Sequence, residues 1–276
     1  MKSSILFAIV TYKERYFDCL SFKSLVRSFD AFGEDKLNVF IFDNTDLNDW
    51  NVESKEIADV NINYFHQNDN RGISFAYNRI ADFALKNEYH WVVFLDQDTT
   101  LPVETYQIYI EKTLNKSGAA IAAPKVLSNR KIISPSKFIF YRSLLFKKID
   151  KNILNFKNIS CINSGLMINV KLFIALGGYN EKLKLDFCDH DFIEKIKKTE
   201  KFLEILKIDF IQDFSSDNNT KEQSIKRYKI FVNDIKQYYR TRNRILVFLL
   251  IDLPHLIKLI YKHKIVYFFK IRFFSK

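Results

Sequence analysis

The stretch that most constrains the fold is residues 90–102, where an apolar run of strand length ends on two carboxylates. Residues 92–95 are all β-branched, aromatic or aliphatic, which predicts a central strand buried on both faces. Open α/β sheets bind ligands just beyond the carboxyl ends of such strands. Asp96 and Asp98 project to the same side of an extended segment, and their oxygens suit Mg²⁺ or Mn²⁺ beside a diphosphate. A polar turn that closes the strand explains the same pattern, so the neighbouring motifs decide.

Further apolar runs alternate with helical patterns and predict an α/β fold with a mostly parallel sheet flanked by helices. Three of the strands end at residues suited to face a ligand, namely Thr11, Asp43 and Asp96. We expect the fifth strand to end at Pro124. Residues 125–157 mix basic and aromatic side chains, and we interpret them as a substrate-facing excursion or as a plain irregular connection. The other expected strands span residues 4–10, 37–42, 61–65, 119–123 and 202–210.

Composition excludes several classes of protein. Only six of the 276 residues are glycine, and no dinucleotide-binding or Walker glycine motif is present. Three widely spaced cysteines predict neither a disulfide framework nor a zinc site, and favour a reducing, cytoplasmic setting. The apolar runs are shorter than the roughly 20 residues that a membrane-spanning helix needs. A net charge of +11 favours a polyanionic partner, which could be nucleic acid, an anionic membrane or a phosphorylated substrate.

Several short motifs follow one another along the chain in a specific order. They are Val10-Thr11-Tyr12, Asp43-Asn44, residues 70–78 (NRGISFAYN), residues 94–98 (FLDQD), Asn163-Ser164-Gly165, Gly177-Gly178, Asp186-x-x-Asp189-x-Asp191 and Tyr238-Tyr239-x-x-Arg242-Asn243. This ordered series resembles family 2 glycosyltransferases of the GT-A fold, over about residues 4–250. The Asp-Gln-Asp motif and the late Tyr-Tyr motif are most similar to the bacterial rhamnosyltransferase branch.

The resemblance implies a division of the chain. We expect a catalytic domain over residues 1–220, with a nucleotide-sugar half (1–124) and an acceptor half (125–220). A basic, aromatic helical region should follow over residues 221–276.

The resemblance also implies a binding site for a nucleotide-sugar donor. Asp43 would bind the base and ribose, Asp98 would be the direct metal ligand, and Asp96 would lie nearer the sugar. Arg240 or Arg242 would contact the diphosphate, for which the arginine side chain is well suited. The remaining residues implied to bind the donor are Thr11, Tyr12, Asn70, Arg71, Gly72, Asn78 and Gln97.

The resemblance assigns the general base to Asp189, with Asp191 as the acid that follows it. One carboxylate opposite the leaving group implies a single displacement with inversion at the anomeric carbon. Family members often carry a metal-binding histidine after the last strand, where this chain has Gln212 and Asp213. Either residue could replace the histidine, or water could fill its position.

We therefore expect transfer of a sugar, with rhamnose from dTDP-rhamnose as the leading hypothesis, to a glycan acceptor of O-antigen or capsule type carried on a polyprenyl diphosphate. Residues 254–276 alternate apolar and basic side chains, which is typical of a peripheral segment on an anionic inner-membrane surface. We expect no nucleic-acid partner, and a homo-oligomer stays open. The alternatives are a UDP-sugar such as UDP-galactose or UDP-N-acetylglucosamine as donor, or a non-catalytic membrane- or nucleic-acid-binding protein on a decayed transferase fold. A sugar-phosphate nucleotidyltransferase is disfavoured because residues 11–15 contain no glycine.

Overall fold

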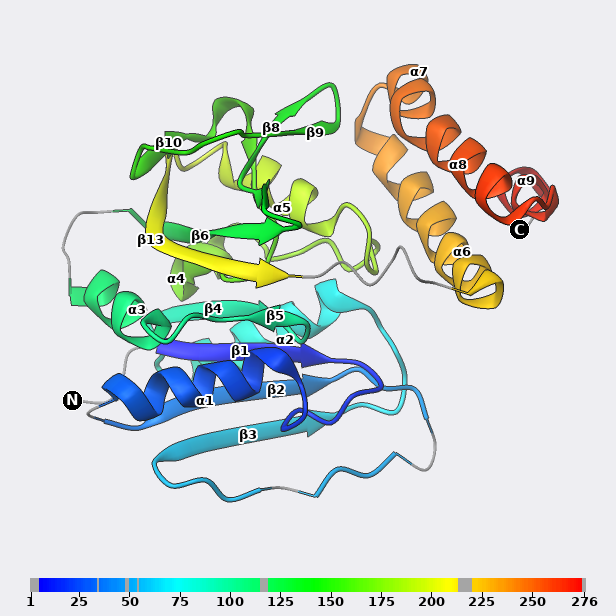
Figure 1. The fold of residues 1–276 in the computed structure, drawn as a ribbon. Coiled ribbons are helices and arrows are strands. Elements are labelled where there is room, and N and C mark those ends of the chain that lie inside the picture. Colours follow the sequence, from blue (N-terminus) through cyan, green and yellow to red (C-terminus); the bar gives the residue numbers. More distant parts are fainter. Residues whose placement is uncertain are drawn as a thin grey trace.

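The protein is described by a computed structural model that covers residues 5–33, 35–47, 50–53, 55–114, 119–212 and 220–274. One large sheet crosses the molecule, with helices on both of its faces (Figure 1). Its strands are β1 (Ile5–Thr11), β2 (Leu37–Asp43), β3 (Val60–His66), β4 (Trp91–Asp96), β5 (Thr99–Thr100), β6 (Ile121–Ser128), β7 (Lys131–Ser134), β10 (Ile153–Asn155), β12 (Met167–Asn169) and β13 (Phe202–Gln212). The main path runs β10-β13-β6-β12-β4-β1-β2-β3, with β5 beside β13 and β7 beside β6.

The helices follow the strands in the alternation that the sequence predicts. They are α1 (Leu20–Phe32), α2 (Ile73–Lys86), α3 (Thr105–Leu114), α4 (Val170–Ala175), α5 (Cys188–Ile196), α6 (Lys221–Tyr238), α7 (Arg244–Val247), α8 (Leu253–His263) and α9 (Tyr267–Phe274). Short 3₁₀ turns η1 (Phe156–Asn158) and η3 (Tyr239–Thr241) and the π-helical turn η4 (Phe248–Asp252) complete the set. In the part of the chain that the structure covers, no helix is both long and apolar enough to span a bilayer.

The sheet is largely parallel, which confirms the predicted fold class. Strands β4, β1, β2 and β3 pair in parallel, and so do β6 and β13. Strand β12 is antiparallel to both β4 and β6, between which it lies. The side chains of β1 alternate between two apolar clusters: Leu6 and Ala8 pack with α2 on one face, and Ile5 and Phe7 pack with α1 and α3 on the other. Every residue of β1 is buried, as expected of a central strand covered on both faces.

Two expectations about the middle of the chain are wrong. Strand β6 does not end at Pro124 but continues to Ser128. The pairing register of β13 shifts opposite Pro124, between Ile205 and Asp209, and this irregularity accommodates a residue that lacks an N–H donor. Residues 125–157 are also not irregular, because they contain β7 and β10 and most of a second, antiparallel sheet. That sheet has the order β11-β8-β9 and consists of β8 (Ser136–Ile139), β9 (Arg142–Leu145) and β11 (Ile159–Ser160).

The C-terminal helices are joined to the rest of the fold through α6. The ring of Phe187 stacks on Tyr238, with centroids 4.6 Å apart, and also contacts Phe231. The buried carboxylate of Asp234 accepts hydrogen bonds of 2.8–2.9 Å from the backbone N–H groups of Lys184, Leu185 and Asp186. Helix α6 therefore holds the segment that leads directly into α5. The division of the chain at residue 220 stays a prediction, and apolar residues from both sides of it share one buried cluster.

We predict that Asp234→Asn lowers the free energy of unfolding by about 2–4 kcal/mol, because it leaves buried N–H groups without an acceptor. Denaturant titration of the full chain measures this loss. The control is Asp30→Asn on the exposed face of α1, which should change stability by less than about 0.5 kcal/mol. Equal stability of the two variants would show that α6 does not hold the segment through Asp234.

Candidate active site

The carboxyl ends of three parallel strands meet at one edge of the sheet. Thr11 at the end of β1 pairs in register with Asp43 at the end of β2. On the other side of β1, Val10 pairs with Asp96 at the end of β4. The three strand ends that the sequence analysis singled out therefore lie next to one another.

Asp96 is held by hydrogen bonds from three elements. Its Oδ1 accepts from the Tyr77 hydroxyl of α2 at 3.0 Å, and its Oδ2 accepts from the Ser164 hydroxyl and, at 3.3 Å, from the Gln212 amide of β13. Burial raises the pKa of the Asp96 carboxyl, and the nearby charge of Asp98 acts in the same direction. The Ser164, Tyr77 and Gln212 hydrogen bonds oppose this shift because they stabilise the carboxylate. Asp96 is thus a half-buried acid whose charge is stabilised by these few partners.

Gln212 links the two aspartates of the central motif. Its Nε2 lies 2.9 Å from Asp98 Oδ1, and its side chain is buried at the end of β13, where Gln212 pairs with Thr99 of β5. Its Oε1 lies 3.1 Å from the Ser164 hydroxyl. Side-chain amide orientation follows the hydrogen-bond network, so a rotation of the amide would turn its oxygen toward the carboxylates. Asp213, the other residue considered as a replacement for histidine, lies outside the described residues.

These residues fit a hard divalent cation by the chemistry of their donor atoms. Two carboxylates, one carboxamide and one hydroxyl converge, and all of them offer oxygen. Among the residues that the structure covers, no group of three His, Cys, Asp or Glu side chains could hold a metal. A metal here would therefore depend on Gln212 or on the bound diphosphate for further ligands.

Asp43 is fully buried, and its carboxylate already accepts three hydrogen bonds. Oδ1 accepts from the Thr45 N–H at 3.0 Å, and Oδ2 accepts from Trp50 Nε1 at 2.6 Å and from the Tyr64 hydroxyl at 2.8 Å. A ligand that binds to Asp43 Oδ2 must take the place of the indole or the phenol.

The loop after β1 is tied to the central motif by Gln97. The Gln97 Oε1 accepts from the Tyr12 N–H at 2.6 Å, and Gln97 Nε2 lies 3.4 Å from the Tyr12 carbonyl. The Tyr12 hydroxyl donates to Asp46 at 3.1 Å. The Thr11 hydroxyl is buried without a partner among the described residues. Thr11, Tyr12 and Gln97 therefore lie together beside Asp96.

Residues 70–72 are packed against the segment that α6 holds. Asn70 Oδ1 accepts from the Gly72 N–H at 3.0 Å, and the Ile73 N–H at the start of α2 donates to the Lys184 carbonyl at 2.7 Å. Gly72 has a φ of +94°, and a Cβ there would lie 2.5 Å from the Lys184 oxygen, so only glycine fits. The exposed Arg71 guanidinium lies 4.0 Å from the centroid of the Phe75 ring.

Asn78 has a structural role in this conformation. Its Nδ2 donates to the Tyr179 carbonyl at 3.1 Å and to Glu181 Oε1 at 2.9 Å, while its Oδ1 accepts from the Tyr179 N–H at 2.8 Å. The side chain is thus engaged with the turn before α5. Its predicted contact with the nucleotide stays a prediction.

Asp189 and Asp191 both lie in the first turn of α5, but their surroundings differ. Asp189 Oδ1 accepts from the His190 N–H at 2.7 Å, and the Asp189 charge contributes to the raised pKa of the buried Cys161 thiol, for which burial is the first cause. Asp191 Oδ1 accepts from Arg242 at 3.0 Å. His190 bonds to the Ser160 hydroxyl at 2.6 Å and stacks on Phe138, which leaves it a structural contact.

Arg242 and Arg240 lie beside α5 in the structure. The guanidinium of Arg242 is only 6% exposed and pairs with both Asp191 and Glu194. Arg240 is exposed on η3 and lines the same pocket as Arg242. The contact of either arginine with the diphosphate stays a prediction.

Sequence reasoning missed several residues that the fold brings to this edge. Tyr77 was missed because it lies among the apolar residues of α2 and was interpreted as a core residue, whereas its hydroxyl donates to Asp96. Ser164 was considered only as part of the Asn163-Ser164-Gly165 motif and not as a partner of Asp96, and Trp50 and Tyr64 carried no signal of a bond to Asp43. A buried tyrosine or tryptophan usually needs a polar partner, and this is the signal that could have found them.

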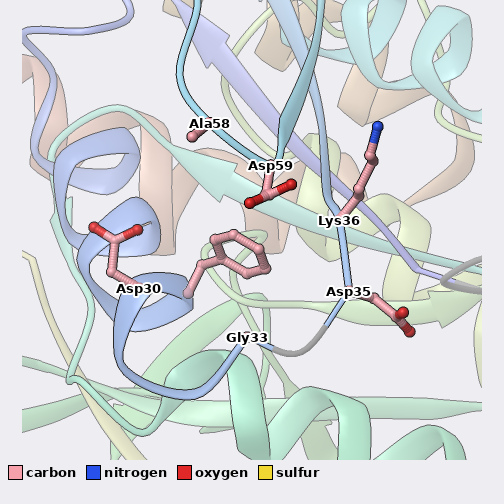
Figure 2. A pocket seen from close by; sticks show the side chains of 7 residues that line it. Asp30, Gly33, Asp35, Lys36, Ala58 and Asp59 are labelled. Carbon is pink, nitrogen blue, oxygen red and sulfur yellow. The ribbon is translucent and has the colours of Figure 1, made fainter.

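A separate pocket lies at the opposite edge of the sheet, where β2 and β3 begin. It measures about 460 Å³, and its lining includes Asp30, Asp35, Lys36 and Asp59. The Lys36 ammonium points away from Asp30 and Asp59 (Figure 2). The length of β2 separates this pocket from Asp43.

Comparison with known proteins identifies the family. The family model described as "Glycosyl transferase family 2" matches residues 7–177, which is more than half of the chain. The chain belongs to glycosyl transferase family 2. This match includes the strand ends of β1, β2 and β4, and thus Thr11, Asp43, Asp96 and Asp98. No curated protein sequence matches the chain at a significant level.

Solved structures of glycosyltransferases are similar to this family 2 member in fold. TarS from S. aureus is 15% identical, with a TM-score of 0.54 over 90% of this chain and 45% of TarS. The TarS fragment 1–349 in complex with UDP-GlcNAc is 13% identical, with a TM-score of 0.55 over 97% of this chain and 81% of the fragment. GalNAc-T7 with UDP, GalNAc and Mn²⁺ is 12% identical, with a TM-score of 0.54 over 76% of this chain and 44% of that protein. The chain thus spans less than half the length of GalNAc-T7 and of full TarS.

For this family 2 glycosyltransferase we predict that Asp96→Asn keeps the fold. In metal-free buffer at pH 7, the free energy of unfolding should stay equal or rise by on the order of 1 kcal/mol, because desolvation and the charge of Asp98 both disfavour an ionised carboxyl here and asparagine has none. Asparagine can still accept from Tyr77 and donate to Ser164. The comparison is Asp82→Asn on the exposed face of α2, measured by denaturant titration. A large loss of stability in Asp96→Asn alone would show that the carboxylate itself holds the edge together.

Proposed function

We propose that this family 2 glycosyltransferase moves a sugar from a nucleoside diphosphate donor to a hydroxyl group of a glycan acceptor, with inversion at the anomeric carbon. The observation that carries the proposal is the convergence of Asp96, Asp98 and Gln212 beside the ends of β1 and β2. The side-chain oxygen atoms at this edge of the sheet are suitable ligands for a divalent cation that is bound together with a diphosphate. Asp98, Asp96 and the Gln212 carboxamide would hold that cation, which when bound neutralises charge on the departing diphosphate.

The base of the donor would bind at Asp43. Indole and phenol groups donate to its Oδ2, and the imide N–H of uracil or thymine is a donor of the same kind. We propose that the base takes the place of Trp50, which is half-buried, while Tyr64 keeps its bond. Both candidate bases fit this scheme, so Asp43 does not separate dTDP-rhamnose from a UDP-sugar.

Asp189 would act as the general base. Its carboxylate accepts the proton of the acceptor hydroxyl, whose oxygen forms the new bond to the anomeric carbon. The bond between that carbon and the diphosphate oxygen breaks, and the diphosphate leaves with the electron pair. Asp189 stands in the first turn of α5, and the segment before it is held by Asp234.

The test is a thermal-shift screen of the full chain with dTDP-rhamnose, UDP-GlcNAc, UDP-galactose and GDP-sugars, with and without Mn²⁺. We expect one donor to raise the unfolding temperature in a metal-dependent way, and Asp98→Ala to abolish that rise because it removes a direct ligand. The sequence resemblance favours dTDP-rhamnose, and the UDP-GlcNAc complex of the similar TarS makes UDP-GlcNAc the second donor to test.

The matched variant is Asp189→Asn. The donor should still raise its unfolding temperature, but the rate at which it hydrolyses the donor, with water as the acceptor, should fall about a hundredfold. Asn is isosteric and removes only the proton acceptor. Undiminished turnover in Asp189→Asn would assign the base elsewhere, and the absence of a response to every donor would overturn the proposed function.

We also propose that the C-terminal helices bind an anionic membrane surface. Tyr261, Val266 and Phe274 are 85%, 72% and 73% exposed, and Lys258, Lys262, Lys264 and Lys270 lie on the same helices or between them. Exposed aromatic and aliphatic side chains among lysines are typical of an interfacial segment. The acceptor would then be a lipid-linked glycan.

Flotation with liposomes tests this. We expect the full chain to float with vesicles that contain phosphatidylglycerol and to stay behind with pure phosphatidylcholine. Tyr261→Asp should reduce flotation, because it places a negative charge at the interface. The control is Leu114→Asp on α3, where the side chain is 74% exposed but distant in sequence from the basic helices. Equal flotation of the two variants would assign lipid binding to another surface.

A further inference from the structure

A pocket of about 660 Å³ lies between α5 and the end of α6, which we call the α5–α6 pocket. One wall is the turn at residues 177–183, the second is the face of α5 that carries Asp191 and Glu194, and the third is formed by residues 237–242. Asp96, Asp98 and Gln212 do not belong to its lining, so the pocket is distinct from the residues proposed to hold the cation. Arg240 and Arg242, which the sequence resemblance assigns to the donor diphosphate, do line it. Its size suits a ligand of about one or two sugar units.

Basic side chains dominate its open rim. Lys182, Lys198 and Arg240 are exposed there, and among the described residues none of them has a carboxylate within ion-pair distance. The acids Asp191 and Glu194 are paired with Arg242, and Glu181 accepts a hydrogen bond from Asn78. The rim therefore attracts anions.

The inner wall carries polar atoms that the protein itself leaves unpaired. In the described part of the chain, Gln237 Oε1, Tyr238 Oη and Arg242 Nε are buried without a hydrogen-bond partner, and all three residues line the pocket. Native proteins pair nearly all such atoms, so three of them along one short segment require an explanation. An amide oxygen accepts, a guanidinium nitrogen donates, and a phenol does both. Sugar hydroxyls, which also donate and accept, match this set after small side-chain adjustments.

We propose that the α5–α6 pocket binds a sugar unit that carries an anionic group, either phosphate or carboxylate. This inference rests on the proposed function, because the unit would belong to the acceptor glycan. Asp189 does not line the pocket, but it lies near Tyr238, which does. Burial is the first cause of the raised pKa of the Tyr238 hydroxyl, and the charge of Asp189 adds to it, so an acceptor anchored here lies within electrostatic reach of the proposed base. The anion binds at the rim, and the hydroxyls face residues 237–242.

The experiment is isothermal titration of the full chain, without donor, against glucose 1-phosphate, glucuronic acid, glucose and inorganic phosphate. We expect at least one of the two anionic sugars to bind more tightly than glucose and phosphate, and its affinity to fall with salt. Whether the phosphate or the carboxylate sugar binds better identifies the anion. If neither binds more tightly than free phosphate, the proposal is overturned.

Two variants locate the ligand. Arg240→Glu should weaken the anionic sugar about tenfold or more, since a charge-assisted contact is lost. The control is Lys229→Glu, an equal charge reversal on the exposed face of α6 outside the pocket. Tyr238→Phe removes an unpaired hydroxyl and should weaken the anionic sugar while leaving the affinity for inorganic phosphate unchanged. Equal affinities in Arg240→Glu and Lys229→Glu would overturn the assignment.

Asp98→Ala separates this inference from the proposed function. Binding of the anionic sugar should survive Asp98→Ala, because Asp98 does not line the pocket. Loss of sugar binding in Asp98→Ala would place the ligand at the donor site and overturn the inference. A third outcome is also informative. If Arg240→Glu weakens binding of the anionic sugar but no nucleotide sugar stabilises the protein, the proposed ligand of the α5–α6 pocket is supported and the proposed function is refuted.

Discussion

The arrangement of the candidate active site depends on how the charge of one half-buried carboxylate, that of Asp96, is stabilised. Asp96 ends the central strand β4, where burial disfavours its charge and Asp98 adds repulsion. The protein offsets this with donors from α2, from the turn at Ser164 and from the end of β13. Each donor stands on a different element, so the packing of those elements and the charge state of the site are coupled. The packing of these elements therefore decides which groups stabilise the charge of Asp96.

A second carboxylate plays a similar structural role in the segment before α5. Asp234 gathers three backbone N–H groups in the segment before α5, and Arg227 of the same helix pairs with Asp186. This segment in turn receives the N–H of Ile73 and packs on Gly72 at the start of α2. The C-terminal helix α6 is thereby connected, through one short segment, to both the loop at residues 70–72 and the helix that carries Asp189. Helix α6 therefore packs against the segment that joins these two parts of the fold.

Much of the fold could be predicted from the sequence, because apolar residues recur with a fixed spacing in strands and in helices. The apolar runs at residues 92–95 and 37–42 have the length and composition of buried strands, and the structure places the acids that end them at one edge of a parallel sheet. The small sheet of β8, β9 and β11 could not be predicted from the sequence. Its strands are two to four residues long, too short for an alternating pattern to stand out, and β9 is exposed throughout. Pro124 misled the prediction for β6, because a proline ends a strand only where its missing N–H would be needed.

The sequence by itself determined the alternation of strands and helices, the acids at the strand ends and the family to which their order belongs, since all of these are patterns along the chain. Only the tertiary structure decided which partners those acids have. Tyr77 and Gln212 reach Asp96 from positions 19 and 116 residues away, and Arg242 binds Asp191 across 51 residues. The hydrogen-bond partner of a side chain depends on how separate elements pack. The local spacing of apolar residues carries no information about which distant elements come into contact. For the same reason the α5–α6 pocket, built from three segments, was visible only in the folded chain.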